Sequence, residues 1–251
     1  MSSWSQRRKT LYALIAIIVV IGVVVVLGYA FFYQKPTCAD GLINGNEQGV
    51  DCGGSCQRLC QTSFLAPSLA WTRFEKIAPS LYNVAAYIVN PNIDAEAFRV
   101  PYHISLYDDR GVLIIDTPGT ITLPPHRNTI AFQRSIDVGK RVPAKALFEF
   151  TDPPQWYKKK DTLAAIAVGD KKYLEDEIGS SLTVTLKNTS VYPLKKIGVY
   201  TVLYDKDGNA LGFSKTSLDE IPPKGTALAP FTWPIKRNGA VISIEVLPVA
   251  E

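Results

Sequence analysis

The pattern of hydrophobic and polar positions divides the chain into one long apolar run and a series of short alternating runs. Residues 11–33 read LYALIAIIVVIGVVVVLGYAFFY and contain no charged side chain. At a rise of about 1.5 Å per helical residue, a run of this length spans roughly 34 Å, enough to cross the hydrocarbon core of a bilayer. Buried strands are usually much shorter, so the run predicts a single transmembrane helix.

After residue 60, apolar and polar residues alternate in short runs. In YHISLYD, for example, Tyr102, Ile104 and Leu106 share one face of an extended strand. The runs end at turn-forming sequences such as Asn-Pro-Asn and Pro-Pro, and Asp-Lys-Asp-Gly-Asn at residues 205–209 predicts a hairpin. Because this region lacks the pattern of a long amphipathic helix, it predicts antiparallel β-sandwiches.

This order of strands and turns occurs twice, with a period of about 98 residues. The matches are Leu-Tyr-Asp at 106–108 with 203–205, the diproline at 124–125 with 222–223, and Phe132 with Phe231. Between the copies, DPPQWYKKKD at residues 152–161 interrupts the strand pattern with prolines and lysines, as a domain boundary does. The sequence therefore predicts one sandwich at residues 62–158 and a second at residues 159–251.

Both copies resemble the FxLYD-type Ig-like domains of bacterial envelope proteins. The sequence VNPN at residues 89–92 is also similar to the group 2 late-embryogenesis-abundant sandwiches. Ile104 and Thr201 stand where the FxLYD pattern has phenylalanine. The resemblance implies two tandem Ig-like domains. It says little about ligands, because both motifs are strand and turn motifs.

Charged residues orient the predicted helix. Three basic residues at positions 7–9 precede the apolar run, whereas Lys35 alone follows it closely. Since cytoplasmic flanks carry the excess of lysine and arginine, we expect residues 1–10 in the cytoplasm, a single-pass signal-anchor in the cell membrane and extracytoplasmic domains. Gly28 and Ala30 allow a cleaved signal peptide as the alternative, but the apolar run is longer than a signal core usually is.

All four cysteines lie in a glycine-rich segment at residues 37–60: Cys38, Cys52, Cys56 and Cys60. In an oxidising extracytoplasmic compartment they predict two disulfides that hold a neck too short to bury its own core. Three pairings are possible. Zinc is the alternative, but the spacing lacks the two C-x2-C knuckles of a structural zinc site. The expected fold class is therefore all-β, with one N-terminal transmembrane helix, a short disulfide-rich neck and two tandem Ig-like antiparallel β-sandwiches.

The neck also contains a set of oxygen-bearing side chains between glycines: Asp40, Asn44, Asn46, Glu47 and Asp51. Such a set is a candidate calcium site, although the EF-hand spacing is absent and these residue types also form turns. From Cys38 to Cys56 the pattern C-x-D-G-x-x-N-G-x-E-x-G-x-D-C-G-G-x-C resembles a small cysteine motif of exported and surface proteins of bacteria. That resemblance implies a location more than an activity.

Catalytic signatures are scarce. The chain has two histidines, His103 in a predicted strand and His126 beside a diproline, and no phosphate-binding glycine loop, G-x-S-x-G or H-E-x-x-H sequence. Asp108 and Asp109 lie at a hairpin turn, where capping explains them better than paired catalysis. Trp71, Trp156 and Trp233 are candidates for a sugar-stacking platform, but core or interdomain packing explains them better.

Beyond positions 7–9 the chain has 24 basic and 23 acidic residues (27 minus 3, against 23), which argues against a nucleic-acid partner. We therefore expect a non-enzymatic, membrane-inserted extracytoplasmic display or protein-interaction module without a cofactor other than calcium. Its partner would be a protein or an envelope polymer. The alternatives are an accessory subunit of an envelope secretion or pilus-type assembly and, third, an envelope hydrolase.

Overall fold

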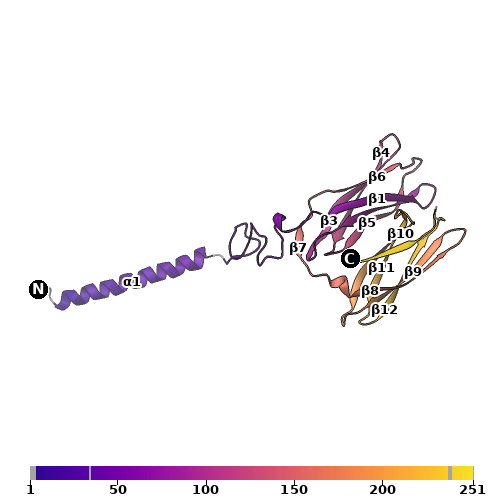
Figure 1. Ribbon diagram of the computed structural model, residues 1–251. Helices are drawn as coiled ribbons and strands as arrows, with labels where there is room; N and C mark the ends of the chain where they lie inside the picture. Colours follow the sequence, from indigo (N-terminus) through magenta and orange to yellow (C-terminus); the bar gives the residue numbers. More distant parts are fainter. Residues whose placement is uncertain (1–3, 34, 237–238, 251) are drawn as a thin grey trace. The chain divides into compact units, whose positions relative to one another are not determined.

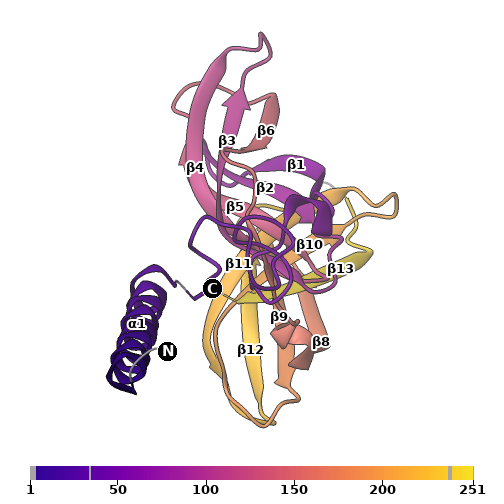
Figure 2. The ribbon, with the colours of Figure 1, turned by 90° about the vertical axis from the view of Figure 1, so that its left-hand side faces the viewer.

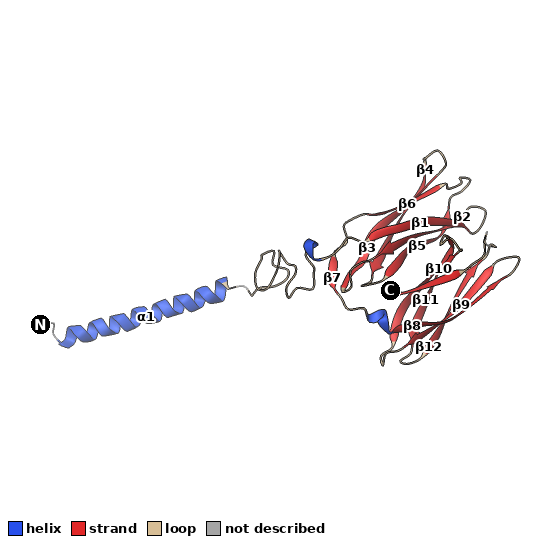
Figure 3. Cartoon of the chain, viewed as in Figure 1, coloured by secondary structure: helices blue, strands red, loops and turns tan. Residues whose placement is uncertain are grey.

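The computed structural model describes residues 4–33, 35–236 and 239–250, and the chain divides into two compact units, Met1–Gly54 and Ser55–Glu251 (Figure 1). The predicted tail and second sandwich also include residues 1–3, 237–238 and 251, which lie outside the described residues. The described residues are mostly in strands, with one long N-terminal helix and two short 3-10 helices (Figure 3). This composition confirms the all-β prediction.

Helix α1 spans Trp4–Phe32. It begins seven residues before the start of the predicted span, 11–33, and ends one residue before the end of that span. The polar residues at its start are compatible with a helix, and no proline or glycine interrupts them. Its large apolar side chains are exposed, from 50% for Ile15 to 87% for Phe32. Water is a poor solvent for such a surface. Within the described residues, Gln6–Phe32 is the one helix long and apolar enough to cross a membrane.

The neck after α1 is built from turns rather than from helix or strand, with an isolated bridge between Gly49 and Cys52. None of the four cysteines is free, so the two predicted disulfides are present. Gly54 has a φ of +56°, and a Cβ atom there would overlap the carbonyl oxygen of Asn46. Glycine is therefore required at this position both by backbone conformation and by space.

The second unit holds two successive sets of strands, which we call the first copy and the second copy. The first copy comprises η1 (Gln61–Ser63), β1 (Ser68–Lys76), β2 (Leu81–Val89), β3 (Ala95–Tyr107), β4 (Leu113–Leu123), β5 (Asn128–Asp137), β6 (Lys145–Phe150) and β7 (Trp156–Lys158). The second copy comprises η2 (Thr162–Ala165), β8 (Ile166–Glu175), β9 (Ser180–Asn188), β10 (Leu194–Tyr204), β11 (Ala210–Ile221), β12 (Thr226–Trp233) and β13 (Ser243–Ala250).

Both copies have the same sheet order. The first copy forms sheets β1-β2-β5 and β4-β3-β6, and the second forms β8-β9-β12 and β11-β10-β13. Every strand pair is antiparallel. Equivalent bulges recur as well, because β3 shifts register between Leu106 and Tyr107 and β10 between Leu203 and Tyr204. The first copy differs by one extra strand, β7, which also pairs with β3.

The four sheets stack as layers around three hydrophobic cores. The first core lies between the two sheets of the first copy, and the second core between those of the second. A third core joins the copies: Ala85, Tyr87 and Ile130 from the β1-β2-β5 sheet pack against Val202 and Phe213 from the β11-β10-β13 sheet. Figure 2 shows the first copy above the second with these two sheets between.

Burial along the strands follows from this order of layers. Strand β2 is buried on both faces from Val84 to Ile88, whereas its counterpart β9 alternates between buried and half-buried residues. Likewise β10 is buried on both faces, whereas β3 alternates. The predicted inward face of β3 is confirmed, because Tyr102, Ile104 and Leu106 are each at most 3% exposed. The inner layers are therefore β2 and β10, and the outer layers are β3 and β9.

The predicted match of Phe132 with Phe231 is wrong by one position. Ala86 pairs with Ala131 in the first copy, and the equivalent pair in the second is Val184 with Ala229. The counterpart of Phe132 is therefore Pro230, next to Phe231 in sequence. Adjacent strand residues face opposite sides. Accordingly Phe132 packs against the third core, whereas Phe231 is buried in the second.

Candidate binding groove

A groove opens in the first copy where strand β3 loses one of its neighbours. Strand β6 pairs with β3 as far as Tyr102, and β7 resumes the pairing at Ala97. Thr151 N–H still donates to the carbonyl oxygen of Pro101 at 3.0 Å, and residues 152–155 then leave the ladder. Pro153 and Pro154 lack the backbone N–H groups that a continuous ladder requires. The diproline thus separates β6 from β7 and leaves no described strand beside residues 98–100 on that side of β3.

The groove has a volume of about 730 Å³ and is lined by residues from three segments, 58–67, 98–101 and 152–157. This volume lies within the range of small-ligand sites. Segment 58–67 is tied to β7, because Leu59 N–H donates to the carbonyl oxygen of Trp156 at 2.8 Å and Lys158 N–H donates to that of Gln57 at 2.7 Å. The chain that enters the first copy and the chain that leaves it therefore form the groove together.

The charge of the groove is positive, since its lining contains Arg58, Arg99 and Asp152 as ionisable side chains besides Tyr157. Both arginines are exposed, and among the described residues neither has a carboxylate within ion-pair distance. Two guanidinium groups without an acidic partner favour a ligand that carries carboxylate or phosphate groups.

Arg99 is held in place by a bulge. Its φ is +50°, in the left-handed region, and β3 shifts register against β4 between Ala97 and Val100. Lys196 occupies the equivalent position of the second copy with a φ of +52°, but β10 keeps its register against β11 there. The strained backbone is therefore a feature of the repeated fold. Arg99 lines the groove, whereas Lys196 lies one residue outside the stretch Ile197–Tyr204 of β10 that pairs with β13.

Aromatic side chains supply the apolar part of the groove. Phe98 is 59% exposed and Tyr157 39% exposed, while Trp156 is buried and packs against Phe64 with ring centroids 5.4 Å apart. The indole Nε1 of Trp156 is buried without a hydrogen-bond acceptor, whereas Nε1 of Trp233 donates to the carbonyl oxygen of Phe213 at 3.2 Å. The groove therefore combines exposed rings with cations.

The three tryptophans do not form a common surface. Trp156 is 1% exposed in the first core and Trp233 is 2% exposed in the second. Trp71 packs at the third core, with its ring centroid 5.3 Å from that of Tyr87 and 6.4 Å from that of Phe213. The prediction of core and interdomain packing is confirmed for all three.

His103 belongs to a polar cluster on the outer face of β3 and β4. The Asp116 carboxylate lies 2.6 Å from His103 Nδ1 and accepts a hydrogen bond from Ser105 Oγ, also at 2.6 Å. The Ser105 hydrogen bond, with a smaller contribution from His103, lowers the pKa of Asp116. Because Ser105 donates to the carboxylate rather than to the imidazole, the cluster lacks the nucleophile-to-base hydrogen bond of a hydrolase. His126 is exposed at a turn, where its N–H donates to the carbonyl oxygen of Asn92.

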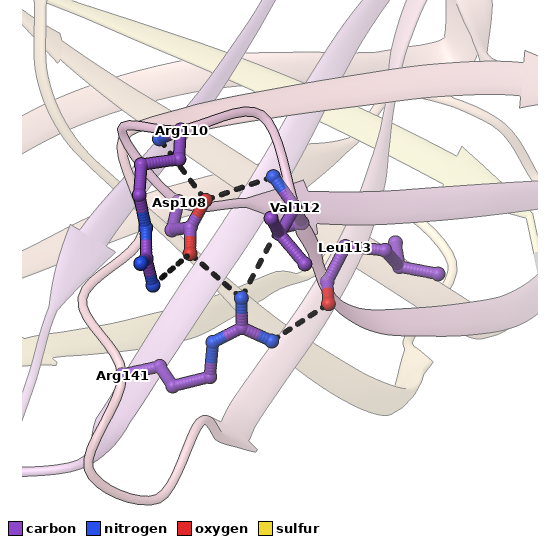
Figure 4. Close-up of polar contacts among 5 residues, drawn as sticks. All are labelled: Asp108, Arg110, Val112, Leu113 and Arg141. Carbon is purple, nitrogen blue, oxygen red and sulfur yellow. Dashed lines mark hydrogen bonds and ion pairs between the residues drawn. The ribbon is translucent and has the colours of Figure 1, made fainter.

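Asp108 locks the hairpin between β3 and β4 (Figure 4). Its Oδ1 accepts from the N–H groups of Arg110 and Val112, and Oδ2 accepts from Arg141 at 2.7 Å. Arg141 also donates to the carbonyl oxygen of Leu113 at 2.8 Å. The hydrogen bonds from Arg141 and Val112 lower the pKa of Asp108. The predicted capping role is confirmed, because the carboxylate is occupied by the turn itself.

The carboxylates of the neck are also occupied by N–H donors. Asp51 accepts from the backbone N–H groups of Asp40 and Gly41, and Asp40 accepts from those of Thr37 and Leu42. Asn44 Nδ2 donates to Asp40 at 2.9 Å, and this bond is the largest cause of the lowered pKa of Asp40. These contacts account for Asp40 and Asp51 as turn formers.

The other candidate calcium ligands contribute less to this network. Glu47 accepts a long hydrogen bond of 3.4 Å from the N–H of Asn44. The backbone carbonyl oxygen of Asn46 lies where a Cβ atom on residue 54 would be, so it packs directly against Gly54. The structure therefore brings the five predicted residues into one segment of turns, in which Asn44 Oδ1 is buried without a hydrogen-bond partner among the described residues.

No family model matches the chain, and no curated protein matches it. Among solved structures, a beta-glucuronidase from glycoside hydrolase family 2 is 13% identical with a TM-score of 0.22, over 87% of this chain and 29% of that one. A protein assigned as a beta-galactosidase from Bacteroides fragilis is 12% identical with a TM-score of 0.20, over 74% of this chain and 41% of that one. The chain thus spans less than half of either enzyme. At these scores neither similarity bears on activity.

Proposed function

We propose that this protein is a membrane-anchored, non-enzymatic interaction module that presents its two sandwiches outside the cytoplasm. The groove beside Arg99 carries this proposal, because it offers exposed cations and rings without the arrangement of nucleophile and base that hydrolysis needs. In this proposal helix α1 is the anchor, and the basic residues at its start favour a cytoplasmic position for that end. The oxidised cysteines of the neck are consistent with an extracytoplasmic compartment.

The membrane part of the proposal is tested by protease accessibility. The full chain with a C-terminal tag is expressed in bacterial cells, and protease is added to intact spheroplasts. We expect the tag to be lost while a fragment containing α1 stays protected. A tag that survives until detergent is added would place the sandwiches in the cytoplasm and overturn the topology. A cytoplasmic protein with the same tag serves as the control for spheroplast integrity.

The cysteines give a second, independent measurement of compartment. In the proposed location, membrane-impermeant maleimide labels the cysteines only after a reductant is added to the spheroplasts. Labelling before reduction would show free thiols and contradict the disulfide-bonded neck. Labelling that requires both reductant and detergent would instead indicate the opposite orientation.

A further inference from the structure

The groove does not end at Arg99. A second hollow of about 360 Å³ shares Phe98 and Arg99 with it and is also lined by Tyr200 and Lys215 of the second copy. The Lys215 ammonium lies 5.3 Å from the centroid of the Tyr200 ring. Cationic side chains therefore occur at both hollows and at the residue between them. A small anion would contact only one of these cationic side chains, whereas an extended ligand would contact several of them.

The backbone beside the groove points to a peptide. Residues 98–100 have no described strand partner on the side that β6 and β7 leave open. Arg58 forms a bridge with Tyr157, and its own N–H and C=O groups are hydrogen-bonded to no described residue. Free main-chain donors and acceptors at the edge of a sheet are the groups that an added strand pairs with.

We propose that the groove binds an extended acidic segment of a partner protein. In an extended peptide with acidic residues at alternate positions, the carboxylates lie on one side and the other side chains on the opposite side. The carboxylates then pair with Arg58 and Arg99, while apolar side chains contact the exposed rings of Phe98 and Tyr157. This proposal rests on the proposed interaction function and names the chemistry of the partner.

Peptide binding is measured on the purified full chain in nanodiscs of neutral lipid. The probe is a fluorescein-labelled peptide, Glu-Leu-Glu-Tyr-Glu-Leu, and its uncharged match is Gln-Leu-Gln-Tyr-Gln-Leu. We expect the anisotropy to rise and saturate with the acidic peptide alone. Because charge-assisted hydrogen bonds are the strong ones, Arg99→Gln should weaken binding by about 10-fold or more, and Arg58→Gln by a similar factor.

Lys196→Gln is the matched control. It removes one positive charge from the equivalent left-handed position of the second copy, which lines neither of the two hollows described above. We expect it to bind the peptide like the unchanged protein. Thermal unfolding of both variants separates loss of binding from loss of folding, and Arg99→Lys should restore part of the affinity if the variant Arg99→Gln is folded but inactive.

Several outcomes would overturn the proposal. Absence of saturable binding by the unchanged protein would do so, as would an equal loss in Lys196→Gln, which would indicate general charge attraction. Binding of an oligogalacturonate of similar charge, without binding of the peptide, would assign the groove to an anionic polysaccharide instead. None of these results depends on membrane orientation, so failure here is distinguishable from failure of the protease test of topology.

Discussion

Equivalent positions of the two copies hold apolar residues on the faces where the copies meet and polar residues on the faces that point outward. Val202 and Phe213 of the second copy lie in the third core, whereas their counterparts in the first copy, Ser105 and Asp116, form a hydrogen-bonded cluster on the outer face. On the other sheet, Tyr87 in the third core corresponds to Thr185, which lies on the outer face of β9 and is half-buried.

The contact between the two copies is asymmetric. The copies are joined head to tail, because the β1-β2-β5 sheet of one contacts the β11-β10-β13 sheet of the other, and these are not equivalent sheets. A head-to-tail contact can in principle be repeated without end. Repeat proteins stop such growth by giving the terminal units polar outer faces. Ser105, Asp116 and Thr185 are polar residues at the outward-facing positions of these two copies.

The largest expected effect is loss of the ring at the centre of the third core. Phe213 is 2% exposed, and Phe213→Ala should destabilise the protein by about 3 to 5 kcal/mol, because it removes a buried ring and leaves a cavity. Asp116→Ala changes the equivalent residue on the outer face and should cost no more than about 1 kcal/mol. Urea unfolding measures both. Equal effects would mean that the inner face is not a core.

A smaller effect is expected at the polar contact inside the interface. Tyr87 OH donates to Glu245 Oε1 at 2.7 Å, and Tyr204 OH donates to Oε2 at 3.0 Å. Tyr87→Phe and Tyr204→Phe should each cost about 1 kcal/mol in the free energy of unfolding. Tyr192→Phe, at a side chain that is 74% exposed, is the control and should leave unfolding unchanged.

The same tyrosines predict an alkaline limit of stability. Burial raises the pKa of Tyr87 and of Tyr204 above the usual value, with Glu245 adding to the effect. A raised pKa in the folded state means that the stabilisation is complete below the unfolded pKa, about 10, and is lost as the pH rises above it. Unfolding measured from pH 8 to 12 should show this loss. The double variant with Tyr87→Phe and Tyr204→Phe should lose less stability over the same pH range.

The hairpin aspartates predict an acid limit of smaller size. Backbone and side-chain hydrogen bonds lower the pKa of Asp108 and of Asp205. A lowered pKa means that the stabilisation is present above the unfolded pKa, about 4, and is lost as the pH falls below it. Asp108→Asn should lower the melting temperature at pH 7 by roughly 5 °C. The further loss of stability at acid pH should be smaller in this variant than in the unchanged protein. The adjacent Asp109→Asn is exposed and should change neither.

The smallest expected effect is a gain of association. One variant carries His103→Tyr and Asp116→Phe, and a second carries Thr183→Ala and Thr185→Tyr, so that each outer face acquires residues of an inner face. Mixed together, they should form a weak heterodimer with a Kd on the order of 100 µM, because the linker that raises the local concentration in the natural contact is missing. Sedimentation of the mixture and of each variant alone measures this. Association of either variant alone would instead indicate an unspecific apolar patch.

Local patterns in the sequence were sufficient to predict several features. The alternation in YHISLYD gave the inward face of β3, and the Asp-Gly turn at residues 205–209 gave the hairpin, in which Asp205 N–H donates to the carbonyl oxygen of Asn209. The cysteine-rich segment gave the disulfides. Each of these depends on residues close together in sequence, and their physical requirements are visible in a short window.

The third core and the groove were not predicted, for different reasons. In YNVAAYIV the apolar residues on both sides of the strand indicate double burial, but the second partner sheet belongs to the other copy, far along the chain. The groove depends on what residues 152–155 do to their neighbours, since the diproline was visible in the sequence only as a boundary. The sequence of the neck predicted turns and calcium ligands equally well, because both uses need the same side-chain oxygen atoms. The residues concerned are Asp40, Asn44, Asn46, Glu47 and Asp51.

The hydrogen bond between Tyr87 and Glu245 joins residues 158 positions apart, so Tyr87 is synthesised well before its partner. Synthesis proceeds at about 5 to 20 residues per second, so roughly 8 to 32 s pass between the two residues. During that interval the face of the β1-β2-β5 sheet that forms the third core has no covering sheet. Stalled chains and chains cut early would display this face, which makes it the place where a chaperone or a neighbouring unfinished chain would bind first.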